Sequence, residues 1–258
     1  MLILIAESKT MTACDKEVSQ EEYTEYKPVG EEIAGEVMSE IAGLMPGDLS
    51  GIAKWSQSMA QRAIMLAYEF PNKTIGSMAI EAYTGVVFRA LGYTSLSEDG
   101  KRRLRKDVKI ISSLYGWVNA DDIIKAYRLD YATPLAPGDK PMILYWKKDI
   151  TIGLVKEIKE RCGESVLNLL PGDAAKGVDW KLVKNFAKVW KVDFKELKDG
   201  GEFRTPTSNK LKELRGHLLR EIMARGIENP TELLTLSTDF LQPMGTPDYP
   251  DHIAFCMR

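Results

Sequence analysis

The chain begins with an apolar run, Leu2 to Ala6, that polar residues end at once. A short apolar run bounded by loop residues predicts a buried strand that opens the fold. The segment 10–29 holds few large apolar groups and many charges, so a loop is expected there. Because ligands commonly bind where the strands of an open α/β sheet end, Lys9, directly after the first strand, is a candidate functional residue.

Two amphipathic helices are expected next, over 31–44 and 49–68, because apolar residues recur at helical spacing in both segments. Met45 to Asp48, with Pro-Gly at its centre, separates them. The pair is a helix-hairpin-helix candidate at about 31–68. Such a hairpin can present backbone N–H groups at the start of its second helix to a phosphate, whereas an ordinary packed helix pair is the alternative.

The rest of the chain alternates irregularly between helical and strand patterns. A capping box of Ser95 and Glu98 predicts a helix, and a strand over 108–116, a helix over 143–161 and a strand over 165–169 follow. Two β-rich runs between 186 and 205 flank an Asp199-Gly200 turn, before a helix over 208–225 and a short helix capped at Asn229-Pro230. This order, without repeat or linker, predicts one mixed α/β (α+β) domain over 1–258, a mixed sheet surrounded by helices.

Composition narrows the class of protein. The chain has 258 residues, 44% hydrophobic and 28% charged, which is ordinary globular composition and excludes a disordered or fibrous chain. Its cysteines, Cys14, Cys162 and Cys256, are widely spaced without a CxxC pair, so we expect neither disulfides nor a zinc knuckle. With no secretory leader and no apolar stretch long enough for a membrane span, a cytoplasmic protein without a membrane partner is expected.

The net charge of −2 hides an asymmetry. Residues 1–100 hold 7 Lys and Arg against 15 Asp and Glu, and the remainder holds 28 against 22, so the two parts carry −8 and +6. The densest basic run lies on the helix after Ser95 and comprises Lys101, Arg102, Arg103, Arg105 and Lys106. This run is either a solvated helix face or part of a nucleic-acid patch.

The helix over 208–225 contains an anomaly. Arg215 falls within its apolar face, so its guanidinium must find an anion, either a carboxylate of this chain or a ligand phosphate. Lys212, Gly216 and Arg220 form an adjoining stripe. A mid-helix glycine costs about 1 kcal/mol, so Gly216 indicates that something approaches this backbone closely.

Other candidate chemistry is limited. Lys9 could hold a phosphate, act as a Schiff-base nucleophile or be a surface lysine. Asp248, Asp251, His252 and His217 are conceivable iron ligands, but their spacing matches no metal motif. The dinucleotide, P-loop, hydrolase-elbow and zincin signatures are absent from the sequence, so neither a cofactor nor a metal site is expected.

Short motifs occur in a fixed order: Leu2-Ile3-Leu4-Ile5 with Ser8-Lys9-Thr10, Tyr83-Thr84-Gly85, Leu114-Tyr115-Gly116, Tyr127-Arg128-Leu129-Asp130, Leu144-Tyr145-Trp146 with Asp149-Ile150-Thr151, Asn168-Leu169, and Lys212 with Arg215-Gly216. In order and spacing they resemble the YaaA-type peroxide-stress response family, from Met1 to about Phe240. The resemblance implies a cytosolic protein that limits hydrogen peroxide damage and is associated with lower free iron. It also implies a mixed α/β fold with a positive cleft, a helix-hairpin-helix element and duplex DNA binding.

The sequence also departs from the family pattern. Glu7 precedes Ser8-Lys9 where the family usually has a Pro-Ala segment before the lysine. Val86 and Phe88 stand where Asp and Tyr are expected. Asn119-Ala120 stands in place of Arg-Pro, and Leu170-Pro171-Gly172 in place of an Ala-Ser segment. Any polar site built from these positions is altered in this chain.

Three functional hypotheses follow. The first is a non-enzymatic DNA-binding protein of peroxide defence, whose phosphate-binding candidates are Lys9, Arg102, Arg103, Arg105, Arg128, Lys212, Arg215 and Arg220. The second is an enzyme acting on a nucleotide, a damaged base or another phosphorylated small molecule, with Lys9, Tyr115, Arg128 and Arg215 converging on a pocket. Direct iron sequestration is the third, and the sequence leaves the oligomeric state open.

Overall fold

The computed structural model describes residues 1–136, 138–161, 165–244 and 251–257. Its main sheet has the strand order β10-β11-β8-β7-β1-β4-β5, with β9 paired to β8. The strands are β1 Leu2–Ala6, β4 Val108–Ser112, β5 Gly116–Asn119, β7 Val166–Asn168, β8 Val189–Leu197, β9 Phe203–Arg204, β10 Leu241–Pro243 and β11 His252–Met257. A small second sheet joins β2 Lys16–Glu17, β3 Ile75–Met78 and β6 Ile123–Ile124.

The main sheet is parallel at its centre and antiparallel at its margins. β1 pairs in parallel with β4 on one side and β7 on the other, and β7, β8 and β11 continue the parallel run. The pairs β4–β5, β8–β9 and β10–β11 are antiparallel. Leu2 to Ile5 of β1 are buried, as expected for a strand covered on both faces. The predicted mixed α/β fold with a mixed sheet is therefore confirmed.

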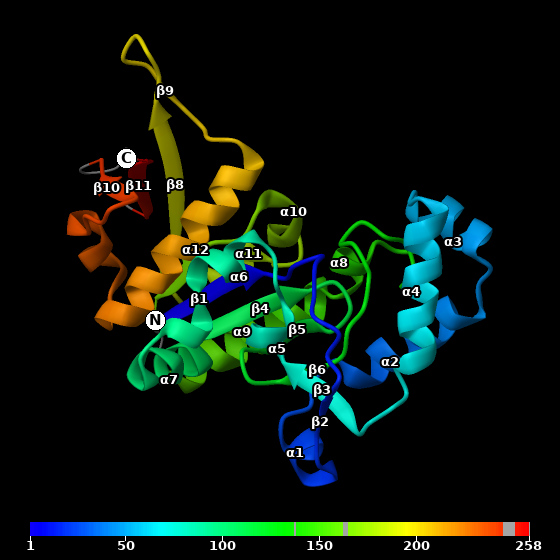
Figure 1. Ribbon diagram of the computed structural model, residues 1–258. Coiled ribbons are helices and arrows are strands. Elements are labelled where there is room, and N and C mark those ends of the chain that lie inside the picture. The colour runs from blue at the N-terminus through cyan, green and yellow to red at the C-terminus, as the bar shows by residue number, and fades with distance from the viewer. Residues whose placement is uncertain (137, 162–164, 245–250, 258) are drawn as a thin grey trace.

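Helices cover the sheet and extend beyond it (Figure 1). In chain order they are α1 Gln20–Glu25, α2 Glu31–Gly43, α3 Pro46–Ala53, α4 Gln57–Glu69, α5 Ala79–Ala82, α6 Val86–Leu91, η1 Tyr93–Ser95, α7 Glu98–Asp107, α8 Met142–Tyr145, α9 Lys147–Glu160, α10 Gly172–Ala175, α11 Trp180–Val183, α12 Ser208–Arg225 and η2 Pro230–Thr235. Helix α12 packs against α6 and α7, and α9 packs against β5 and α11. Helices α2, α3 and α4 form a lobe beside the sheet, shown blue to cyan in Figure 1.

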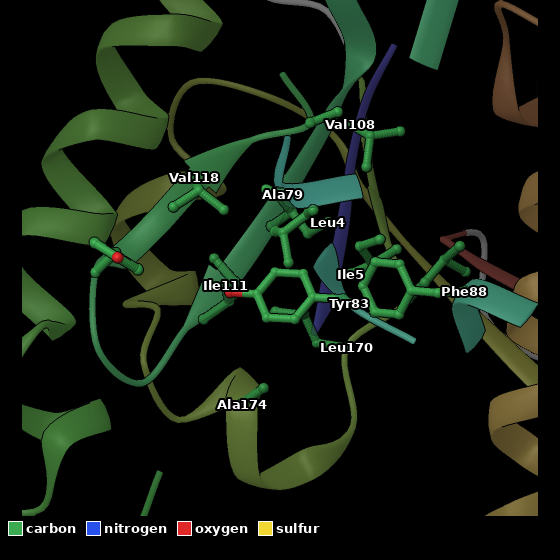
Figure 2. Packing of buried hydrophobic residues seen from close by; sticks show 14 of the residues in the cluster. Leu4, Ile5, Ala79, Tyr83, Phe88, Val108, Ile111, Val118, Leu170 and Ala174 are labelled. Atoms are coloured by element: carbon green, nitrogen blue, oxygen red, sulfur yellow. The ribbon is translucent and has the colours of Figure 1, made fainter. Parts of the chain in front are cut away.

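The buried core joins the sheet to the segments that cover it. Figure 2 shows the Tyr83 ring between Ile111 and the side chains of Ile5 and Phe88. The rings of Tyr83 and Phe88 lie 5.2 Å apart between centroids. Because Ile5 and Ile111 belong to the adjacent strands β1 and β4, this packing fixes the chain after α5 against the carboxyl ends of those strands.

Several predicted elements are confirmed, and others are wrong. The helix over 208–225 is α12, which Thr207 caps at its start and Gly226, in the left-handed region, at its end. The helix expected over 49–68 is instead two helices, since Pro46 occupies the first turn of α3 and Lys54 ends it with a positive φ. Ser56 then caps α4.

Two further boundaries need correction. Ser97 rather than Ser95 caps α7, because its side chain accepts the Gly100 N–H. The expected loop over 10–29 contains the short strand β2 and the helix α1. In the helical lobe, Leu44 and Met45 link α2 to α3, and α4 packs against both. A helix-hairpin-helix DNA-binding element there stays a prediction.

Close packing of α12 on α6 explains Gly216. A Cβ atom at this position would lie 2.3 Å from the Val87 carbonyl oxygen and 2.6 Å from the Ala90 Cβ. The close approach that the sequence indicated is therefore made by the backbone of α6. In the described part of the chain, no helix is both long and apolar enough to cross a membrane.

We expect Gly216→Ala to lower the free energy of unfolding by roughly 1–3 kcal/mol, because overpacking against the α6 backbone outweighs the gain of about 1 kcal/mol in helix propensity. Gly35→Ala is the matched control, since no atom beyond the neighbouring backbone of its own helix lies within 4 Å of a Cβ built at Gly35 in α2. This control should be neutral or stabilising. Urea unfolding of both variants measures the difference, and equal stability of the two would contradict the packing argument.

Candidate functional site

A cavity of about 300 Å³ opens at the carboxyl ends of the central parallel strands. The end of β1 and the residues after it form one wall, α6 forms a second, and the first half of α12 forms a third. Its lining includes Ile5, Glu7, Ser8, Lys9, Gly85, Val86, Phe88, Arg89, Tyr131, Leu169, Pro171, Asp173, Lys212 and Arg215. This is the edge at which open α/β sheets bind ligands. Its volume is at the small end of ligand pockets.

Arg215 is the most distinctive group of the cavity. Its side chain is only partly exposed, and within the described residues it makes neither an ion pair nor a hydrogen bond. Burial lowers the pKa of the guanidinium, and the negative charge of Asp173 acts in the opposite direction. Lys212, one turn earlier on α12, is exposed and lines the same cavity. A desolvated guanidinium that makes no ion pair or hydrogen bond with described residues is a candidate contact for an anion.

Asp130 connects two other predicted cations at the cavity rim. Its carboxylate accepts hydrogen bonds from Lys9 at 2.6 Å, from Arg128 at 2.8 Å and from the Trp55 indole at 2.8 Å. Burial alone would raise the pKa of Asp130, but the hydrogen bonds from Arg128, Lys9 and Trp55 lower it below its usual value. The Arg128 guanidinium also lies 4.9 Å from the centre of the Trp55 ring. Asp130 therefore joins the helical lobe to the loop after β1.

Lys9 lines the cavity, but its surroundings differ from those of a nucleophilic lysine. Schiff-base lysines are desolvated so that the neutral amine is available. The Lys9 side chain is 62% exposed and its ammonium contacts the Asp130 carboxylate. The geometry suits an electrostatic role better than a covalent one, and an enzymatic activity based on Lys9 stays a prediction.

Glu7 forms the innermost polar group at the end of β1. Its carboxylate accepts hydrogen bonds from the Ser113 N–H at 2.8 Å and from the Tyr127 hydroxyl. The Tyr127 hydroxyl is 2.7 Å from the Tyr83 hydroxyl and 2.8 Å from the Ser112 hydroxyl. Burial raises the pKa of Glu7 to about 7, against the lowering effect of its hydrogen bonds. The departure at position 7 thus places a carboxyl that titrates near neutral pH beside the cavity.

The other arginines that the sequence suggested as phosphate contacts lie outside the cavity, and their side chains contact protein groups. Arg103 donates to the Met223 carbonyl at the end of α12, Arg105 donates to the Tyr93 hydroxyl, and Arg220 donates to the Leu91 carbonyl. Arg102 is exposed and pairs with Asp99. Helix α7 leads into the amino end of β4, whereas the cavity lies at the carboxyl ends of the strands. Only Lys9, Lys212 and Arg215 of the predicted set line the cavity, and Arg128 is linked to Lys9 by the Asp130 carboxylate that both contact.

Tyr115 and Asn119 also lie away from the cavity. The Tyr115 hydroxyl accepts the Lys125 N–H, and it does not line the cavity with Lys9, as the enzyme hypothesis expected. Asn119 accepts a hydrogen bond from Lys109 and donates to Asp122. By contrast, the departures Val86, Phe88 and Pro171 all line the cavity, so they make its wall more apolar.

Sequence reasoning missed Arg89, Asp173 and Tyr131 as cavity residues. The Tyr83-Thr84-Gly85 motif carried a usable signal, because a glycine in a motif can mark a close approach of two segments. In the structure, a Cβ at Gly85 would lie 2.1 Å from the Ser8 hydroxyl oxygen. Gly85 therefore lets the start of α6, and with it Arg89, approach the loop after β1. Asp173 carried no such signal, since its short helix α10 is positioned only by the tertiary fold.

The conceivable iron ligands do not gather in the described residues. There, no group of three or more His, Cys, Asp or Glu side chains could hold a metal ion. The His217 ring stacks on Phe240 with 3.8 Å between ring centroids, and His252 lies 3.3 Å from Asp193. Asp248 lies outside the described residues.

The fold and the cavity define a mixed α/β protein with a cation-lined hollow at the carboxyl edge of its sheet. A family model described as "Peroxide stress protein YaaA" matches residues 1–242. The chain is 30% identical over 237 residues to a UPF0246 protein of Shewanella woodyi, with 90% of each chain covered. It is 28% identical over 240 residues to UPF0246 protein BF3795 of Bacteroides fragilis, covering 92% of this chain and 91% of that one. The chain belongs to the peroxide stress protein YaaA family.

Glu7 makes stability depend on pH. Its carboxyl has a pKa of 4.5 when unperturbed and of about 7 in the folded protein, so between these values the folded state binds the extra proton. Stability from this group therefore falls as the pH rises through that window. Relative to Glu7→Gln, the wild type should lose about 2 kcal/mol of unfolding free energy between about pH 5.5 and pH 8. Urea unfolding of both proteins tests this, and a constant difference across pH would disprove the assignment.

Proposed function

We propose that this member of the family serves in peroxide defence by binding duplex DNA, with phosphates contacted at the Arg215 and Lys212 wall of the cavity. The observation that carries the proposal is the desolvated Arg215 guanidinium in the cavity lining, which makes no ion pair or hydrogen bond in the described part of the chain. The family resemblance supplies DNA as the source of the anion. We propose the cytoplasm as the compartment, and lower free iron as an effect in the cell rather than as metal binding by this chain.

The chemistry of Arg215 fits a phosphate. A guanidinium presents a planar set of N–H donors that matches phosphate oxygens, and these hydrogen bonds gain strength where water is excluded. Lys212 adds a mobile charge at the same wall. Both contacts address the backbone of DNA and not its bases, so the proposed binding is largely independent of sequence.

The distribution of charge limits the face that DNA can approach. Residues 1–100 carry a net −8, and much of that charge lies in the lobe of α2 to α4 and its neighbour α1. Residues 101–258 carry +6 and include α12. Electrostatic steering therefore favours approach over α12 rather than over the lobe.

We expect the double variant Lys212→Ala, Arg215→Ala to bind a labelled duplex more weakly and with less salt dependence. Loss of two phosphate contacts should reduce the slope of log affinity against log salt by about 2. Fluorescence anisotropy over a series of salt concentrations measures this slope. The double variant Lys147→Ala, Lys148→Ala is the matched control, since it removes two exposed cations of α9 and so changes the net charge equally. An unchanged slope in the double variant would refute the proposed contact.

The stability of an Arg215 variant gives an independent test of whether this residue serves binding or the fold. Because Arg215 is desolvated and makes no ion pair or hydrogen bond with described residues, Arg215→Met should unfold at equal or higher urea concentration than the wild type while binding DNA more weakly. A large loss of stability would instead show that Arg215 serves the fold. The unfolding curve and the anisotropy titration of one preparation separate the two roles.

A further inference from the structure

A second concave surface lies on the other side of α10. It measures about 500 Å³, and the charged side chains among its described lining residues are Lys176, Lys181, Lys184 and Lys191. These lysines come from the end of α10, from α11 and its last turn, and from β8. We call this surface the lysine groove. Four cations converge there from three parts of the fold.

Most of these ammonium groups are available. Lys184 lies 3.3 Å from Asp251. Within the described residues, the side chains of Lys176, Lys181 and Lys191 make no ion pair or hydrogen bond, and all three are exposed. Like charges that share a concave surface repel one another unless an anion binds between them. The groove therefore attracts negative charge without a carboxylate of its own lining to neutralise it.

The lysine groove adjoins the cavity through a shared wall. Leu169, Pro171 and Asp173 line the cavity, whereas Asn168, Gly172 and Ala175 line the groove. The single segment 168–175 thus presents one side to each hollow. Both lie at the carboxyl end of β7, so an extended ligand that contacts Arg215 is close to the groove as well.

We propose that the lysine groove binds a further stretch of the sugar-phosphate backbone of the same duplex that contacts the cavity. This inference rests on the proposed function. A polyanion fits better than a small anion, because exposed lysines are hydrated, mobile point charges that suit several phosphates at once. The groove contrasts with the cavity, where the desolvated Arg215 suits one closely bound phosphate.

The test uses the triple variant Lys176→Ala, Lys181→Ala, Lys191→Ala in the full chain. Loss of three phosphate contacts should reduce the salt slope for a long duplex of about 30 base pairs by roughly 2 to 3. Affinity at low salt should fall with it. A short duplex of about 8 base pairs presents fewer phosphates to the two surfaces, so the difference between wild type and variant should shrink. The triple variant Lys147→Ala, Lys148→Ala, Lys156→Ala, on exposed positions of α9, changes the charge equally and is the control.

The outcomes separate this inference from the proposed function. If the groove variant keeps the wild-type slope while the Lys212→Ala, Arg215→Ala variant loses it, the groove is not part of the DNA site and only the cavity contact stands. An equal loss in the α9 control would also overturn the inference, since net charge would then explain the effect. If the wild type binds neither duplex at low salt, the proposed function fails together with the inference that depends on it.

Discussion

The position of β1 is the constraint on which both the fold and the site depend. Its backbone pairs with β4 on one side and β7 on the other, and its side chains from Leu2 to Ile5 are buried. Apolar side chains at every one of these positions suit a strand that is covered on both faces. Because the strand is fixed in this way, its end is fixed too. The Glu7 carboxylate is held by the Ser113 N–H just beyond β4, and Lys9 emerges at the cavity rim.

The cations of this protein divide according to their partners. Arg103 and Arg220 donate to backbone carbonyls and so tie α12 to α7 and to the end of α6. Arg128 and Lys9 share the Asp130 carboxylate, which links the sheet to the helical lobe through Trp55. The cations around α10 are different, since within the described residues Arg215, Lys176, Lys181 and Lys191 make no ion pair, and of the groove lysines only Lys184 pairs with a carboxylate, that of Asp251. A bound anion can supply the negative charge that the fold itself does not.

This division also separates structural arginines from binding arginines within one helix. Arg215 and Arg220 both lie on α12, yet Arg220 is satisfied by the Leu91 carbonyl and the Ser95 hydroxyl. Arg215 faces a cavity in which Val86, Phe88 and Pro171 contribute apolar wall, whereas the wall after β1 is polar. An apolar wall excludes water and strengthens the interaction of the guanidinium with any anion that enters.

The sequence by itself determined the elements whose signals are local. The apolar run of β1, the Asp199-Gly200 turn between β8 and β9, and the full length of α12 follow from side-chain periodicity and capping. It also indicated that Arg215 and Gly216 were unusual, because an arginine within an apolar face and a mid-helix glycine break a local rule. The motifs in order were enough to identify the family.

Only the tertiary structure decided which partner each residue has. Pattern alone did not predict the left-handed Lys54 that divides the expected second helix, since the break is completed by the distant contact of Trp55 with Asp130. Nor could it distinguish Arg103 from Arg215, which are both helical arginines, because a carbonyl at the end of α12 satisfies the first and an open cavity surrounds the second. Periodicity determines which face of an element is buried, whereas a binding site is determined by groups far apart in sequence that packing brings together or leaves without a partner.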